Sequence, residues 1–242
     1  MEFKEMSIKE ICNEIDLIIA GTDNRKDYKN IYYSLHSALT RRIIYSDIAL
    51  ICETILKIAK TKNKILRYLE KDFWGFVNAA SLKIIFSKKI VLGENEELLA
   101  NTCYDNINKR ILSKIVGVVE EVIGLKDDNS KGSELRRSGA LNVLADMICY
   151  IHVPVAKRLF LDSINSNNQK EQYAALLGLE NYFSFSNDEI ETDLVDALDK
   201  IKDETDDRAI ASTCLQIQIN AGIIDEMVAL DEIDDWKDEH YY

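Results

Sequence analysis

Apolar residues recur along most of the chain at the spacing of an α-helix, three and four positions apart. Four runs carry this pattern most clearly, and their members are Ile11, Ile15, Ile18 and Ile19; Ile48, Ile51, Cys52, Ile55, Ile58 and Ala59; Leu141, Leu144, Ala145, Ile148 and Ile151; and Ile190, Leu194, Ala197, Leu198 and Ile201. Side chains at these spacings share one face of a helix, as in helices packed against a core. The pattern predicts amphipathic helices in both halves of the chain.

Polar residues stand where three of the expected helices should begin. Each is a Ser or Asn followed three residues later by Glu, the spacing of a capping box. The three pairs are Ser7 and Glu10, Asn168 and Glu171, and Ser186 and Glu189. The last pair places one helix at residues 188–203. Gly21 and Gly222 follow helical runs, at positions where a left-handed C-terminal cap favours glycine.

Two stretches, 84–92 and 116–123, are rich in β-branched residues, which strands also favour. We expect helix in both, because each lies inside a long run without turn residues. The segment Lys126–Ser133 has the composition of a loop and divides the chain into two halves.

Composition narrows the fold class further. The 242 residues include 9 Gly and 1 Pro, whereas average usage would give roughly 29 of the two together. A β-sandwich or barrel needs these residues at its many turns, so such folds are excluded. Because 47% of the residues are hydrophobic and 30% are charged, the chain can bury a sizeable core. The expected fold class is all-α.

Neither a membrane segment nor a secretory signal is expected. The sequence has no run of about 18 apolar residues, and its start at Met1–Met6 lacks a basic-then-apolar pattern. Its five cysteines are widely spaced and lie mostly among apolar residues, as reduced core cysteines do. These features together predict a cytoplasmic protein.

Three segments of the second half repeat at offsets of 35 and 36 residues. The equivalent positions are Ala140, Ala175 and Ala211; Leu144, Leu179 and Leu215; and, in the following helices, Leu159, Leu194 and Leu230. A small residue lets two helices approach closely, and a leucine one turn later fills the seam between them.

At these positions the sequence resembles the HEAT/armadillo-like helical repeat family, over roughly residues 133–235. The resemblance implies a right-handed α-solenoid of stacked antiparallel helical hairpins, six or seven by length, as a single domain over residues 1–242. A subdivision at the loop 126–133 is the alternative. A tetratricopeptide array has a similar period, but its characteristic Trp, Gly-Tyr and Pro positions are absent.

Motifs that carry catalysis are absent, including nucleophile elbows, phosphate-binding glycine loops and H-E-x-x-H. Cys149 and His152 are three residues apart and could offer two metal ligands, but zinc needs three or four. We therefore expect no catalytic residues, no metal and no cofactor, and a protein that is not an enzyme.

A basic stretch supports one alternative. Six cations fall within 15 residues, and Phe73 and Trp74 follow them; the cations are Lys57, Lys60, Lys62, Lys64, Arg67 and Lys71. A cationic face with a tryptophan on a HEAT-like chain is similar to the DNA-repair glycosylases built on HEAT-like repeats. The formal net charge of −12 would repel phosphate, however. A lysine-rich solvent face is the plainer interpretation.

The negative charge is concentrated at one end of the sequence. Residues 1–187 carry 26 Lys and Arg against 24 Asp and Glu, a balance of +2, whereas residues 188–242 carry 4 against 18, a balance of −14. The candidate partner-binding residues are therefore Asp193, Asp196, Asp203, Asp206, Asp207, Asp231, Asp235 and Trp236, with Tyr182 as a second aromatic anchor. Since second helices line the groove of such solenoids, some of these acids should face a partner.

The sequence thus predicts a non-catalytic protein-binding module whose acidic groove docks a basic protein or peptide. A bacterial inhibitor or immunity protein that neutralises a cationic toxin, such as a nuclease, is one concrete form, since the Lys-, Ile- and Asn-rich composition is typical of AT-rich bacterial genomes. An assembly scaffold, and acids that serve only solubility and capping of the solenoid end, remain alternatives.

Overall fold

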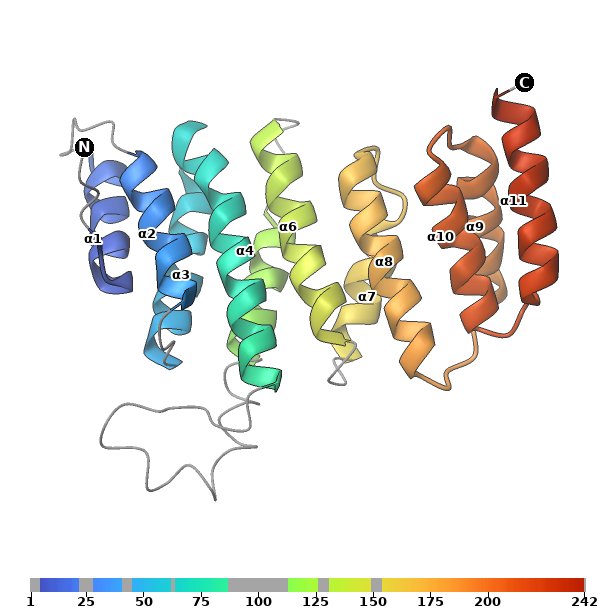
Figure 1. Cartoon of the computed structure of the whole chain (residues 1–242), viewed down its shortest axis with the longest axis horizontal. Helices are drawn as coiled ribbons and strands as arrows, with labels where there is room; N and C mark the ends of the chain where they lie inside the picture. The colour runs from blue at the N-terminus through green and yellow to red at the C-terminus, as the bar shows by residue number, and fades with distance from the viewer. Residues whose placement is uncertain are drawn as a thin grey trace, which may run out of the picture. The chain divides into compact units, whose positions relative to one another are not determined.

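The computed structural model describes residues 5–21, 28–40, 45–61, 64–86, 113–125, 131–148 and 154–241. Within these ranges every regular element is a helix and none is a strand, which confirms the all-α class. The helices are α1 (Ile8–Ile19), α2 (Tyr28–Thr40), α3 (Tyr45–Lys60), α4 (Lys64–Phe86), residues 113–123, α6 (Lys131–Ile148), α7 (Pro154–Ser163), α8 (Gln169–Phe185), α9 (Thr192–Glu204), α10 (Arg208–Asn220) and α11 (Glu226–Tyr241) (Figure 1).

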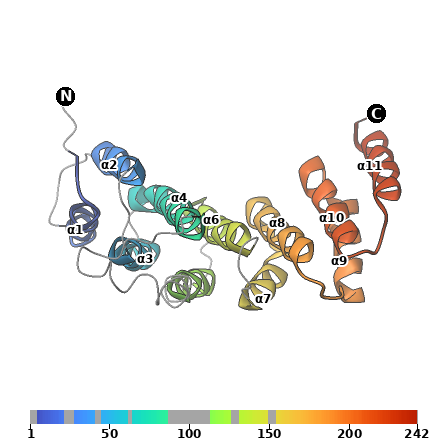
Figure 2. The same cartoon turned by 60° about the horizontal axis from the view of Figure 1, so that its bottom comes forward.

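The chain divides into two compact units, Met1–Met147 and Ile148–Tyr242. In the first unit the helices form two layers. Helix α1 packs against α2 and α3, and α4 packs against α2 and α3. The helix at 113–123 joins the layer of α1 and α3, and α6 joins the layer of α2 and α4 (Figure 2).

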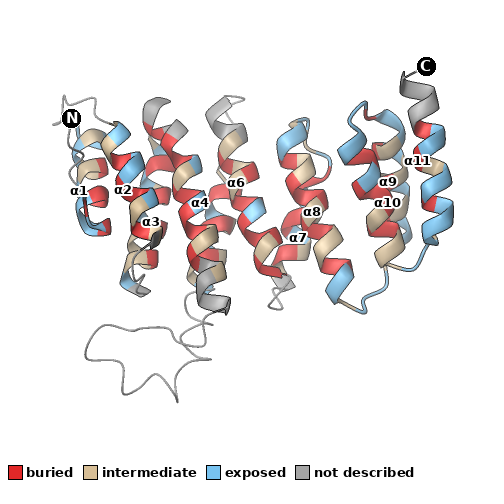
Figure 3. Ribbon diagram, in the orientation of Figure 1, coloured by how far each residue is buried: buried red, intermediate tan, exposed pale blue. Residues whose placement is uncertain are grey.

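In the second unit, α8 packs against α7 and α10, and α10 packs against α9 and α11. The closest antiparallel pairs are therefore α7 with α8 and α9 with α10. The repeat spacing had paired each first helix with the helix that follows it; of these pairs, α10 and α11 are also in contact. In both units the buried residues lie on the faces where neighbouring helices meet (Figure 3).

Two of the three predicted helix starts are confirmed. The Ser7 hydroxyl accepts from the Glu10 N–H at 3.3 Å, and the Glu10 carboxylate accepts from the Ser7 N–H at 2.8 Å, which completes a capping box. The Asn168 side chain accepts from the first N–H groups of α8. Gly21 and Gly222 have φ of 70° and 72°, the left-handed conformation expected of them.

The third predicted start is wrong, because residues 186–191 are not helical and α9 begins at Thr192. Ser186 is instead the C-cap of α8, where its N–H donates to the Tyr182 carbonyl. The Asp188 carboxylate accepts from the Tyr182 hydroxyl, which holds this connection in an extended form. The N-cap of α9 is Glu191, which makes no side-chain capping bond.

The predicted apolar stripes are buried wherever the structure describes them, apart from a few edge positions. Every member of the run from Ile48 to Ala59 is buried, as are Leu141, Leu144, Ala145 and Ile148. The ambiguous residues 116–123 and 84–86 are helical, as expected, while 87–92 and Ile151 lie outside the described residues. The predicted loop extends too far, because Lys131, Gly132 and Ser133 already belong to α6.

The repeat register holds in the first helices and fails in the last. The alanines and leucines aligned in α6, α8 and α10 are all buried. Leu230 in α11 is 52% exposed, although its aligned partners Leu159 and Leu194 are buried. The buried face of α11 is formed by Ala229, Ile233 and Trp236, so the alignment is off by one residue, or about 100° around the helix.

Candidate functional site

Helix α9 carries the centre of the predicted acidic site. Its core face is Leu194, Leu198 and Ile201, whose i, i+4, i+7 spacing keeps them together. Asp196 and Asp203 are exposed two turns apart on the opposite face, and Asp193 is exposed in the first turn. The same amphipathic pattern that buries the leucines therefore presents three carboxylates to solvent.

The turn after α9 holds two more predicted residues, which differ in their roles. Asp206 is exposed. Asp207 is the N-cap of α10, and its carboxylate accepts from the Ala209 N–H at 2.8 Å. A carboxylate at this position stabilises the helix start by satisfying an otherwise unpaired N–H. Asp207 thus has a structural role as a helix cap, whereas Asp206 is an exposed residue of the connecting turn.

Helix α11 contributes exposed Asp231 and Asp235, but it does not present its tryptophan. Trp236 is 4% exposed and packs in a core cluster with Ala211, Leu215, Ala229 and Ile233. Its indole N–H donates to the Lys202 carbonyl at 3.2 Å. The predicted aromatic anchor is therefore a core residue that joins α11 to α9 and α10, and we leave it out of the candidate surface.

Tyr182, the second suggested anchor, is also a core residue, with 6% of its surface exposed. Its hydroxyl donates to the Asp188 carboxylate, and this bond, together with burial, raises the pKa of Tyr182 to about 12. The Lys157 ammonium lies over its ring, 5.5 Å from the centroid.

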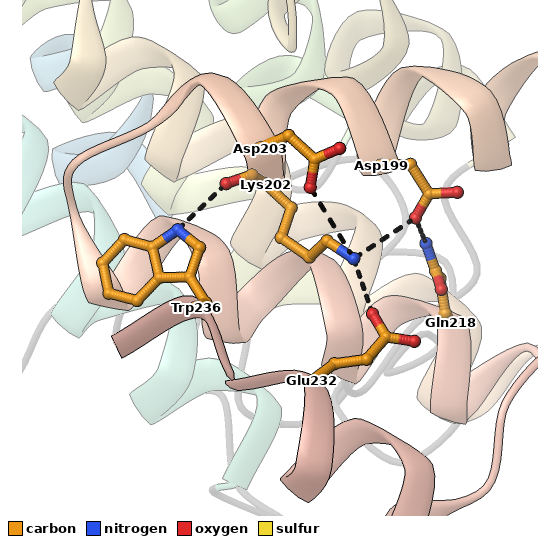
Figure 4. A network of polar contacts seen from close by, with 6 residues as sticks. All are labelled: Asp199, Lys202, Asp203, Gln218, Glu232 and Trp236. Atoms are coloured by element: carbon orange, nitrogen blue, oxygen red, sulfur yellow. Dashed lines mark hydrogen bonds and ion pairs between the residues drawn. The ribbon is translucent and has the colours of Figure 1, made fainter. Parts of the chain in front are cut away.

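A feature that the sequence analysis missed is a lysine held among acids between α9 and α11 (Figure 4). The Lys202 ammonium lies 2.5 Å from the Glu232 carboxylate and 3.9 Å from those of Asp199 and Asp203. Gln218 donates to Asp199 at 2.8 Å. Burial alone would lower the pKa of Lys202, but Glu232 and the two aspartates outweigh it and raise the pKa above its usual value.

Lys202 is therefore held most closely by Glu232, while Asp193, Asp196 and Asp203 are exposed to solvent. Its spacing from Asp199 is visible in the sequence as an i, i+3 pair. Its bond to Glu232, thirty residues away, has no local signal. On the outer face, Lys200 lies 3.9 Å from Glu204, an exposed pair of the kind worth little.

The basic stretch is largely paired where the structure describes it. Lys57 donates to both carboxylate oxygens of Asp16 at 2.7 Å, and Lys60 lies 2.6 Å from Glu121. Lys71 is exposed. Lys62 and the side chains of Lys64 and Arg67 lie outside the described residues. The pairs join helices α1, α3 and 113–123 within one layer.

Phe73 and Trp74 are buried in the first unit, and a carboxylate lies beside the tryptophan. The Trp74 indole N–H donates to Glu70 at 3.4 Å, and Arg136 of α6 donates to the other oxygen of Glu70 at 3.3 Å. The Arg136 and Glu70 side chains are 4% and 1% exposed. This group ties α4 to α6 and gives a ligand no access from solvent.

The remaining candidate chemistry is not assembled in the part of the chain that the structure describes. Cys12, Cys52 and Cys214 are buried free thiols, as expected, and burial raises the pKa of the first to about 11 and of the other two to about 12. Cys149 and His152 lie outside the described residues. Among the described residues, no three His, Cys, Asp or Glu side chains are grouped to hold a metal ion.

Among the described helices, none combines the length and the apolar character that crossing a membrane requires. No family model matches the sequence, and neither the curated proteins nor the solved structures contain a significant match to it.

Proposed function

We propose that this chain is a non-catalytic helical-repeat module that binds a basic protein partner. The partner would dock on what we call the acidic surface: Asp193, Asp196, Asp203, Asp206, Asp231 and Asp235. The observation that carries the proposal is the exposure of these carboxylates on α9, the next turn and α11, while Lys202 is already engaged most closely by Glu232. Concentrated like charge opposes folding, so a binding role would account for its presence.

A HEAT-like right-handed solenoid is the architecture that we propose for the module. Each unit supports it in part, since the first has two parallel layers of helices and the second repeats the pairing of α7 with α8 in α9 with α10. The repeat unit would then begin one helix later than the sequence spacing suggested. Stacked hairpins of this kind offer long surfaces for extended partners.

The physical contribution of the acidic surface would be largely kinetic. Complementary charge steers a partner toward its site and raises the association rate, with a strong dependence on ionic strength. A bacterial inhibitor or immunity protein that must capture a cationic toxin rapidly, such as a nuclease, fits these properties. We propose this as the concrete form of the function.

The test is capture of partners from the native host by the tagged full-length chain, followed by salt elution and mass spectrometry. The variant Asp193→Lys, Asp196→Lys, Asp203→Lys should lose the captured basic protein. A matched control, Glu14→Lys, Glu53→Lys, Asp162→Lys, changes the net charge equally and leaves every residue of the acidic surface in place. It should keep the partner. Equal capture by wild type and both variants would contradict the proposal and favour acids that serve only solubility.

A nucleic-acid enzyme is the second candidate, and the Glu70 carboxylate beside Trp74 is the observation that favours it. Burial of both residues and the pairing of Lys57 and Lys60 argue against it. Fluorescence anisotropy with duplex DNA at low ionic strength distinguishes the two. Binding that Lys57→Glu and Lys71→Glu abolish would support this candidate over the acidic docking surface.

A further inference from the structure

The segment before and within the first turns of α11 concentrates exposed apolar side chains. Of the nine large hydrophobic side chains exposed in the described part of the chain, four lie here: Ile223, Met227, Val228 and Leu230. Met227 is 68% exposed and Leu230 is 52% exposed. They are three residues apart on the helix, so they adjoin on one face. Single exposed apolar residues are ordinary, but such a group indicates an interaction site.

The charge around this apolar group restricts what can cover it. Helix α11 contains seven Asp and Glu residues against one Lys, a formal charge of −6. Asp231 and Asp235 are exposed on the side of α11 that carries Met227. A second copy of the chain would bring two such helices together, and like charges across an interface oppose association. A purely apolar partner would desolvate these carboxylates without compensation.

The remaining occupant combines an apolar stripe with cations. In the second unit, the other apolar face of α11 packs against helix α10. An amphipathic helix is the element that lays an apolar stripe along such a face and places Lys and Arg beside it. We propose that Met227 and Leu230 are the apolar centre of a docking site for a cationic amphipathic helix, whose Lys and Arg side chains meet Asp231 and Asp235.

This inference rests on the proposed function and adds where the partner sits and what its binding segment is. It also predicts two separable contributions. The carboxylates supply salt-dependent attraction to any cation, while Met227 and Leu230 select a partner whose apolar residues lie on one side of a helix.

The methionines offer a direct test. The chain has four, Met1, Met6, Met147 and Met227, and Met6 and Met147 are buried. The full-length chain, labelled with ¹³C at methionine methyl groups, is titrated with an amphipathic Leu/Lys peptide of about five helical turns, or 18 residues. The control peptide has the same composition in a scrambled order. A Met227→Leu variant assigns the Met227 methyl signal and preserves the apolar surface.

We expect the amphipathic peptide to shift the Met227 methyl signal and to leave the Met147 signal in place. The scrambled peptide should bind more weakly and leave Met227 unchanged. Leu230→Ser should weaken binding of the amphipathic peptide by roughly tenfold, which is the affinity that burial of one leucine side chain contributes. Phe185→Ser, which removes an apolar side chain on α8 that is even more exposed than Leu230, should leave the binding unchanged.

Other results separate the two proposals. Peptide binding that leaves Met227 unmoved, or equal effects of the two peptides on it, would overturn this inference and leave the acidic surface standing. Absence of binding by either peptide at low ionic strength would overturn both. A Met227 shift that depends on protein concentration without peptide, together with a dimer in sedimentation, would assign the face to a second copy.

Discussion

Gly178 lies in α8 at its contact with α7, and the structure predicts that no larger residue fits there. A Cβ at this position would lie 2.3, 2.4 and 2.5 Å from three ring atoms of Phe160. Ordinary contacts begin near 3.4 Å, so the ring would have to retreat by about 1 Å. Because Phe160 is fully buried, its ring can move only against the residues packed around it and not into solvent.

The magnitude follows from two opposed effects. Replacing a mid-helix glycine by alanine ordinarily stabilises a helix by about 1 kcal/mol. Overpacking a core costs about 1–3 kcal/mol, and occasionally more, and a clash this close falls at the upper end. We therefore expect Gly178→Ala to lower the free energy of unfolding by roughly 2 kcal/mol. Gly75→Ala in α4 is the control, because nothing lies within 4 Å of its Cβ. It should stabilise by roughly 0.5–1 kcal/mol.

The assay uses the two tryptophans, since Trp74 belongs to the first unit and Trp236 to the second. In a Trp74→Phe background, the fluorescence of Trp236 during urea unfolding measures the effect of Gly178→Ala on the second unit. In a Trp236→Phe background, the fluorescence of Trp74 measures the effect of Gly75→Ala on the first. Phe160→Leu should relieve most of the effect of Gly178→Ala in a double-mutant cycle. If Gly178→Ala proves as stabilising as Gly75→Ala, the packing of α7 on α8 described above is wrong.

Three further predictions concern buried polar and titratable groups. Arg136→Met should destabilise the first unit by about 3–5 kcal/mol, because it removes the cation beside buried Glu70. Adding Glu70→Gln should restore most of the lost stability. An unchanged unfolding midpoint for Arg136→Met would refute the ion pair. The buried cysteines Cys12, Cys52 and Cys214 should resist alkylation by iodoacetamide in the native protein and react in concentrated urea, as peptide mass spectrometry can show. Rapid alkylation of the native protein at these residues would contradict their burial. Because the pKa of Tyr182 is raised from 10.0 to about 12, the stability that its hydroxyl contributes is complete below pH 10 and is lost as pH rises to about 12. The free energy of unfolding should therefore fall more steeply over this range in wild type than in Tyr182→Phe. Parallel curves for the two proteins would refute the bond from Tyr182 to Asp188.

Local signals in the sequence predicted local structure well. The Ser7–Glu10 box and Asn168 define helix starts because the side chains that form the caps lie within three residues of the groups they bind. The same spacing at Ser186–Glu189 predicted a helix start that the structure does not have, because Asp188 bonds to Tyr182 of the preceding helix. The contact from Asp188 reaches Tyr182, which lies outside the residues 186–189 that form the capping pattern, so the pattern alone could not show that no cap forms there.

Contacts between helices could not be read from spacing alone. The repeat offset placed Leu230 in the core, but α11 is rotated so that Ala229, Ile233 and Trp236 are buried instead. The composition of the acidic segment predicted exposed carboxylates correctly at Asp193, Asp196 and Asp203. It could not predict Lys202 bound to Glu232, or Lys57 bound to Asp16, since these pairs are 30 and 41 residues apart.

We propose that the acidic surface attracts a basic partner by its charge. The most direct measurement is the association rate of the captured partner with wild type and with Asp193→Lys, Asp196→Lys, Asp203→Lys, by stopped-flow fluorescence over a range of ionic strength. If this attraction operates, the wild-type rate falls steeply with rising salt concentration, and the variant rate is low and nearly independent of it. Wild-type and variant rates that coincide at every ionic strength would contradict it.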